Sequence, residues 1–126
     1  MTKAATTYAT AALATSAAMF GEVEHQMRIA ACALDAAEQV QFDAGVTECP
    51  AAEQAYVAHQ EAIAAAVQTA YEFLAMPATH RADITARAKQ VAQAFDGKMS
   101  PAGRFRGPKL DPQLSAAIKR SIAIAA

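Results

Sequence analysis

Residues 20–45 read FGEVEHQMRIAACALDAAEQVQFDAG, and their pattern decides the fold. Apolar residues recur there at intervals of three and four, at Phe20, Val23, Met27, Ala30, Leu34 and Ala37. This spacing places one apolar stripe along one side of an α-helix. Glu24 and Arg28 stand four residues apart in the favourable order for an ion pair, and Gly45 is a natural helix end. The stretch therefore predicts a long amphipathic helix.

A second helix follows after a short connection. Thr47-Glu48-Cys49-Pro50 is typical of a helix start, because proline in the first turn costs no backbone hydrogen bond. Its apolar residues again recur by three and four, at Ala52, Tyr56, His59, Ile63, Val67, Ala70 and Leu74. Pro77 ends this helix after Met76, because proline disfavours helical geometry in the preceding residue. The short connection predicts that the two helices pack as an antiparallel hairpin.

Two shorter helices complete the prediction. We expect Thr79 to cap a third helix that runs to Asp96 and stops at Gly97. Its apolar stripe is Ile84, Ala88, Val91 and Phe95. Residues 98–110 (KMSPAGRFRGPKL) hold two prolines and two glycines and predict an exposed loop. Asp111-Pro112 then starts a last helix. Its narrow apolar face is Leu114, Ile118 and Ile122.

The predicted class is all-α, because no stretch of useful length alternates in the manner of a strand. We expect a small helical bundle with a long helical hairpin, a third helix, a basic Gly/Pro loop and a short C-terminal helix. Residues 1–97 form the bundle in this prediction, with 1–15 as a flexible start, and residues 98–126 form the basic loop plus the C-terminal helix. Whether the first helix begins near Thr2 or near Thr15 stays open.

The composition predicts self-association. Of the 126 residues 54% are hydrophobic, but 36 are alanine and only 22 are Leu, Ile, Val or Phe. A core with so few large side chains stabilises a monomer weakly, so we expect a homodimer.

The expected location is the cytoplasm. No apolar run reaches the roughly 18 residues that a membrane span needs. Two cysteines are too few for a disulfide scaffold. The first 19 residues lack the apolar block of a signal peptide, although Ala14-Thr15-Ser16-Ala17 has the small residues of a cleavage site.

Charge is segregated along the chain. Residues 1–63 contain two bases and eight acids, a net charge of −6, whereas residues 64–126 contain nine bases and four acids, a net charge of +5. Such asymmetry bears on partners and on association rates. The alternative is that the two halves neutralise each other, within the domain or across a dimer.

The basic residues near the C-terminus are the predicted partner-binding residues: Lys98, Arg104, Phe105, Arg106, Lys109, Lys119 and Arg120. Positive charge on flexible backbone suits phosphates, and an aromatic ring stacks on an unpaired base. The same residues suit an acidic protein groove, with Phe105 as an anchor. A solvated loop between helices is the third interpretation.

Candidate chemistry is sparse. Glu22 and His25 form one Glu-x-x-His step, whereas a di-iron bundle needs two. His59 lies on an apolar stripe, where a core histidine is the ordinary case, and Cys32 could face it across the hairpin. Cys49 at a helix start is a candidate redox thiol. A nucleophile and base also need an orienting group and an oxyanion site, so we predict no catalytic residue, no metal and no cofactor.

Residues 31–95 resemble a group of small helical proteins of alphaproteobacteria and of their phages and prophages. The residues that carry the resemblance are Ala33-Leu34-Asp35-Ala36-Ala37-Glu38, Met76-Pro77-Ala78-Thr79 and Arg87-Ala88-Lys89. In that group a Pro-Ala-Thr-Thr turn opens a helix that carries a lysine. Here His80 replaces the second threonine, and Asp83 stands where a glycine is usual. The group has no established activity, so the resemblance implies genomic context.

The leading functional hypothesis is a non-enzymatic helical module that binds another macromolecule, a protein or a nucleoprotein complex. The resemblance implies a specific case, a phage- or prophage-encoded inhibitor of a host defence complex of the anti-CRISPR type. The alternatives are a nucleic-acid-binding protein that uses the basic 98–120 region, and a metal- or thiol-dependent enzyme.

Overall fold

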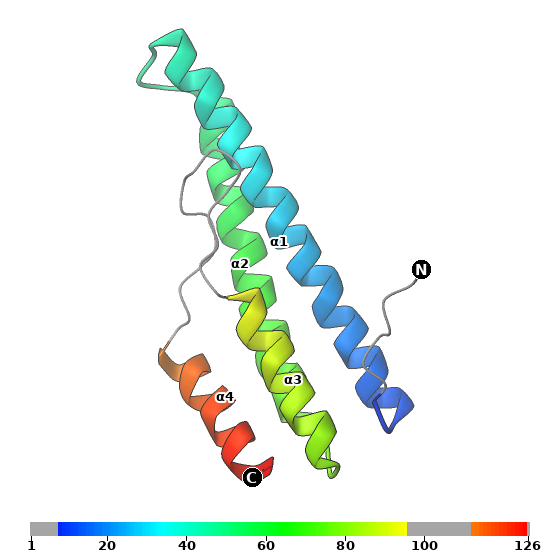
Figure 1. The fold of residues 1–126 in the computed structure, drawn as a ribbon. Coiled ribbons are helices and arrows are strands. Elements are labelled where there is room, and N and C mark those ends of the chain that lie inside the picture. The colour runs from blue at the N-terminus through cyan, green and yellow to red at the C-terminus, as the bar shows by residue number, and fades with distance from the viewer. Residues whose placement is uncertain (1–7, 96–111, 126) are drawn as a thin grey trace.

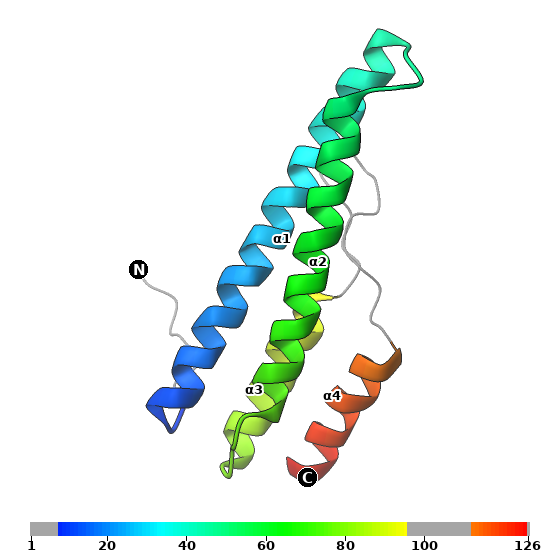
Figure 2. The same ribbon diagram turned by 180° about the vertical axis from the view of Figure 1, so that it is seen from behind.

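The computed structural model describes residues 8–95 and 112–125, which form four helices and no strand. The helices are α1 (Ala11–Ala44), α2 (Pro50–Ala75), α3 (Arg81–Ala94) and α4 (Pro112–Ala125). In Figures 1 and 2, α1 and α2 run side by side as a long antiparallel hairpin, and α3 and α4 lie along one end of it. The all-α class and the hairpin are thus confirmed.

None of these four helices combines the length and the apolar character that crossing a lipid bilayer requires.

Local signals explain both ends of α1. Thr10 is the N-cap, and its hydroxyl accepts a 3.1 Å hydrogen bond from the Leu13 N–H. Gly45 adopts the left-handed conformation at φ 68°, and its N–H donates to the carbonyls of Gln41 and Phe42. The predicted helix end at Gly45 is confirmed. The beginning at Ala11 lies between the two positions that the sequence left open.

The ends of α2 follow the prediction. Pro50 occupies the first helical position, with Cys49 as N-cap. At the other end Met76 is already extended (φ −61°, ψ 142°), directly before Pro77.

The predicted start of α3 at Thr79 is wrong. His80 is the N-cap, and the Thr79 hydroxyl lies 3.5 Å from the His80 Nδ1 rather than against a backbone N–H. At the other end α3 stops at Ala94, with Phe95 as its cap, so the predicted helical Asp96 lies beyond the last helical residue. Asp96 and Gly97 themselves are outside the described residues.

Three phenylalanines hold the helices together at the end of the hairpin where α3 and α4 pack. The Phe20 ring of α1 stacks on Phe73 of α2 at a centroid distance of 5.8 Å, and Phe95 packs against Phe20 at 6.3 Å. Leu114 and Ile118 of α4 are buried in the same core. The apolar stripes predicted for α1 and α3 are the faces that make this core.

Two predicted core positions are wrong. Tyr56 is 54% exposed, whereas Ala52 and His59 of the same predicted stripe are buried. Ile122 is 47% exposed, whereas its neighbour Ser121 is buried. Near the end of α4 the side chain of Ser121 is therefore buried instead of that of Ile122.

Candidate partner-binding surface

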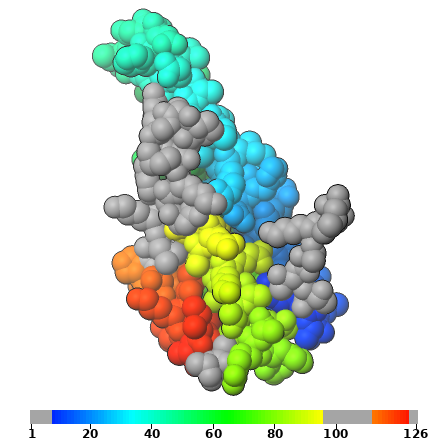
Figure 3. Space-filling model, in the orientation of Figure 1, coloured from blue at the N-terminus to red at the C-terminus, as the bar shows by residue number. Residues whose placement is uncertain are grey.

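The free end of the α1–α2 hairpin projects beyond the rest of the bundle (Figure 3). Phe20 of α1 stacks on Phe73 of α2, so these two residues lie at the same height along the hairpin. Because the helices are antiparallel, each step forward from Phe20 in α1 is matched by a step back from Phe73 in α2, and the numbers of residues at the same height add up to about 93. Phe95, which ends α3, packs at the level of Phe20. We call residues 29–64, which lie past this level, the hairpin arm.

The hairpin arm exposes large apolar side chains. These are Ile29, Val40, Phe42, Val46, Tyr56 and Val57. Phe42 in the last turn of α1 is 76% exposed, the highest value among the large hydrophobic side chains that the structure describes as exposed. Exposed apolar side chains that gather on one part of a monomer mark an interaction surface more often than scattered ones do.

The same arm is uniformly acidic. It contains no lysine or arginine, and its acids are Asp35, Glu38, Asp43, Glu48, Glu53 and Glu61. The nearest base along α1 is Arg28, which lies just below the arm and is paired with Glu24 at 2.8 Å, as predicted. The arm therefore combines exposed apolar groups with a net negative charge, which attracts a positively charged surface.

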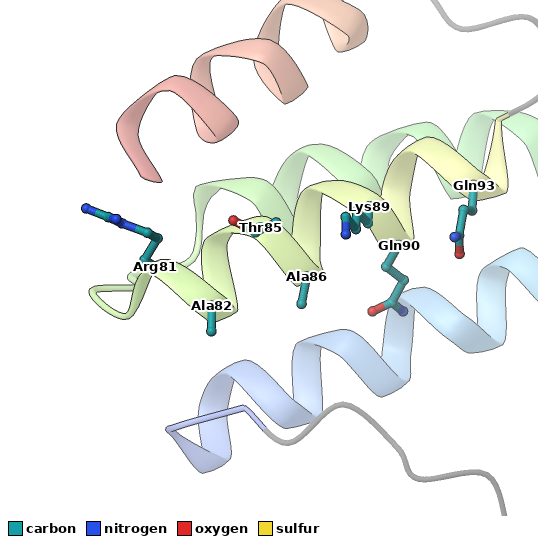
Figure 4. A pocket seen from close by; sticks show the side chains of 7 residues that line it. All are labelled: Arg81, Ala82, Thr85, Ala86, Lys89, Gln90 and Gln93. Atoms are coloured by element: carbon teal, nitrogen blue, oxygen red, sulfur yellow. The ribbon is translucent and has the colours of Figure 1, made fainter. Parts of the chain in front are cut away.

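The α3–α4 face at the other end of the molecule has the opposite charge. The exposed charged side chains of α3 and α4 are all cationic: Arg81, Lys89, Lys119 and Arg120. Asp83 is buried, and its Oδ2 accepts a 3.0 Å hydrogen bond from the Ala9 N–H. Figure 4 shows an open hollow along α3, lined by Arg81, Ala82, Thr85, Ala86, Lys89, Gln90 and Gln93.

Two of the predicted partner-binding residues, Lys119 and Arg120, are exposed neighbours on α4. The others, Lys98, Arg104, Phe105, Arg106 and Lys109, lie outside the described residues.

The residues considered for catalysis do not converge. Cys32 is exposed whereas His59 is only 4% exposed, so they do not face each other across the hairpin. The reason is helical periodicity, because Cys32 precedes the buried Leu34 by two residues, about half a turn. Glu22 and His25 are exposed on α1. In residues 8–95 and 112–125, no group of three His, Cys, Asp or Glu side chains is placed to hold a metal ion.

A partly buried polar cluster joins the start of α1 to α3. The Tyr8 hydroxyl donates to Gln90 Oε1 at 3.0 Å, and Gln90 Nε2 donates to the Ala17 carbonyl at 3.2 Å. Burial raises the pKa of Tyr8 above its ordinary value, and the neighbouring Asp83 raises it further. These bonds fasten the residues before and within α1 to α3.

Arg87 lies on the same helix as Gln90, but its side chain reaches the end of α2 rather than α1. Its Nη1 donates to the carbonyls of Phe73, at 3.2 Å, and Met76, at 2.7 Å, in the last turn of α2. The Phe73 carbonyl also accepts a 3.2 Å hydrogen bond from the Met76 N–H, so Arg87 adds a charged donor to the carbonyls at this helix end. Burial lowers the pKa of the Arg87 guanidinium.

The apolar spacing of the first helix did not single out Phe42 as an exposed surface residue. The sequence does contain a signal for it, because Phe42 does not continue the spacing that links Phe20, Met27 and Leu34, and it comes just before the stop at Gly45. No family model matches this chain, and no curated protein or solved structure matches it either.

Proposed function

We propose that this chain is a non-enzymatic helical module that acts by binding another macromolecule, and that the hairpin arm is the surface it uses. The observation that carries the proposal is the projecting end of the hairpin, where Phe42 and Tyr56 are exposed among acidic side chains. Large aromatic side chains at a protein surface are the usual anchors of interfaces, because they bury much apolar area at a small entropic cost.

The sequence resemblance supports a specific case of this function. In a phage or prophage, a small helical binder of this kind would act as a stoichiometric inhibitor of a host defence complex, of the anti-CRISPR type. The charge of the arm supports such a role, because a nucleoprotein complex offers cationic protein surfaces that normally contact phosphates.

Capture of a partner from a bacterial host lysate tests the proposal. Wild-type protein is compared with Phe42→Ser, and Met19→Ser serves as the matched control, because Met19 is an exposed apolar residue of α1 outside the arm. We expect wild type and the Met19 variant to retain the same partner, and the Phe42 variant to lose it. Capture that does not depend on Phe42, or no specific capture by wild type, contradicts the proposal.

Nucleic-acid binding is the second candidate. The adjacent exposed cations Lys119 and Arg120 on α4 favour it, together with the basic residues that precede α4 in the sequence. This function predicts an affinity that falls steeply with salt and falls again in Arg106→Glu. A gel-shift series with a short single-stranded and a short duplex DNA distinguishes it from protein binding. A shift that does not respond to salt would remove this candidate.

A further inference from the structure

The two oppositely charged surfaces of this chain complement each other, but they lie at opposite ends of the same molecule. We infer that two copies of the chain pair antiparallel, with the hairpin arm of each copy lying along the α3–α4 face of the other. This pairing goes beyond the proposed function, since it concerns what covers the arm when no other macromolecule is bound.

Charge is the first argument. The arm exposes four acids, Asp43, Glu48, Glu53 and Glu61, and contains no lysine or arginine. The outer faces of α3 and α4 present four exposed cations, and the acid of α3, Asp83, is buried against the Ala9 N–H. In a two-fold pair each arm meets the cationic face of the other copy, so both attractive contacts form at once. A parallel pair would instead place arm beside arm and bring like charges together.

Length is the second argument. The part of α1 that belongs to the arm, from Ile29 to Ala44, spans 16 residues, or about 24 Å at 1.5 Å per residue. Helices α3 and α4 have 14 residues each, or about 21 Å. The length of the hairpin arm therefore matches the length of the helices that would lie against it. Both views of the fold show α3 and α4 confined to one end of the hairpin, away from the arm (Figures 1 and 2).

The surface chemistry is the third argument. The hollow on α3 has alanine methyls at Ala82 and Ala86 between the cations Arg81 and Lys89 (Figure 4). Small side chains at such a place let a second helix approach closely. The exposed apolar side chains of the arm could contact the alanine methyls, and its carboxylates could pair with the cations beside them. Burial of these apolar groups would also add to the small apolar area that the core of one chain can bury by itself.

The pairing has a consequence for function. A partner that binds the arm would have to displace the second copy, so the paired form would hold the arm until that partner arrives.

Charge exchange between the two surfaces tests the pairing. The arm variant is Asp43→Lys/Glu48→Lys/Glu61→Lys, and the face variant is Lys89→Glu/Lys119→Glu/Arg120→Glu; all six side chains are exposed. The control is Glu22→Lys/Glu72→Lys, which reverses two exposed acids of the same hairpin outside the arm. Circular dichroism of each variant verifies that its helices are retained, and sedimentation velocity measures the association.

We expect wild type and the control to be dimers at low salt that dissociate as salt rises. In each triple variant like charges face each other, so the dissociation constant of its dimer should rise by about tenfold or more. The two triple variants mixed one to one should recover the dimer, because both contacts are again between opposite charges. A wild type that is monomeric at low salt, or a mixture that does not recover the dimer, overturns the pairing.

The outcomes of this test and of partner capture are independent. A monomer that still captures a partner through Phe42 overturns the pairing alone. A salt-sensitive dimer that is recovered by charge exchange but captures nothing overturns the proposed function alone.

Discussion

Arg87 Nη1 donates a 2.7 Å hydrogen bond to the carbonyl oxygen of Met76, the residue at which α2 ends. The same nitrogen reaches the Phe73 carbonyl, so one side chain of α3 closes the last turn of α2. This places a cation at the negative end of a helix, where the helix dipole favours it. The contact also ties the hairpin to α3 across the turn that contains Pro77.

Arg87→Met should lower the free energy of unfolding by about 2 kcal/mol, because the buried Phe73 carbonyl and the partly buried Met76 carbonyl lose a charged donor. Urea denaturation measures the change. Lys89→Met is the matched control on the exposed side of the same helix, and it should alter stability by about 0.5 kcal/mol at most. Equal effects of the two substitutions would contradict the role assigned to Arg87.

Phe73→Ala should cost about 3–5 kcal/mol, because the Phe73 ring is fully buried and contacts both Phe20 and Tyr8. Phe42→Ala should cost about 0.5 kcal/mol or less, because Phe42 is mostly exposed. Thermal unfolding followed by circular dichroism compares the two. A large loss in Phe42→Ala would mean that Phe42 supports the fold rather than a binding surface.

Tyr8→Phe should change how stability responds to alkaline pH. Burial raises the pKa of the folded Tyr8 above the ordinary value of 10.0, so the folded state keeps the proton to a higher pH than the unfolded chain does. The stabilisation is therefore complete below pH 10 and is lost as pH rises above it.

The measurement is urea denaturation of wild type and Tyr8→Phe on both sides of pH 10. Wild type should lose more stability across this range than the variant. At neutral pH the variant should be weaker by about 1 kcal/mol, because the hydrogen bond to Gln90 is gone. Parallel losses in the two proteins would show that Tyr8 does not contribute to the alkaline transition.

Gly21 lies within α1 and Gly45 caps its end. Substitution of each by alanine should change stability in opposite directions. Gly21→Ala should stabilise the protein by about 0.5–1 kcal/mol, because an added Cβ meets nothing within 4 Å and alanine favours the helix. Gly45→Ala should destabilise it by about 1 kcal/mol or more, because φ is +68° there. Midpoints of chemical unfolding measure both, and a stabilised Gly45→Ala would contradict the left-handed helix end.

Sequence reasoning predicted the boundaries of the elements well where a proline or a glycine marks them, as at Pro50 and Gly45. It failed at Thr79, because the choice between two adjacent cap residues depends on the path of the chain after Pro77 and not on residue type alone. It also placed Tyr56 in the core, since helical spacing tells which residues share a face but not whether another helix covers that face.

The candidate site was harder to predict than the fold. The charge segregation is visible in the sequence, and it drew attention to the basic residues of the C-terminal half. The exposed Phe42 and the acidic arm became a candidate surface only when the described helices showed where α3 and α4 pack.

The 3–4 spacing of Phe20, Met27 and Leu34 and the connection around Pro50 were by themselves enough to determine an antiparallel helical hairpin, because helix periodicity and turn chemistry act between near neighbours. Only the tertiary structure decided that the described helices α3 and α4 pack along one half of this hairpin and not along the arm. That outcome depends on contacts between residues far apart in the chain, above all Phe20 with Phe73 and Phe95, which hold α3 at one end of the hairpin.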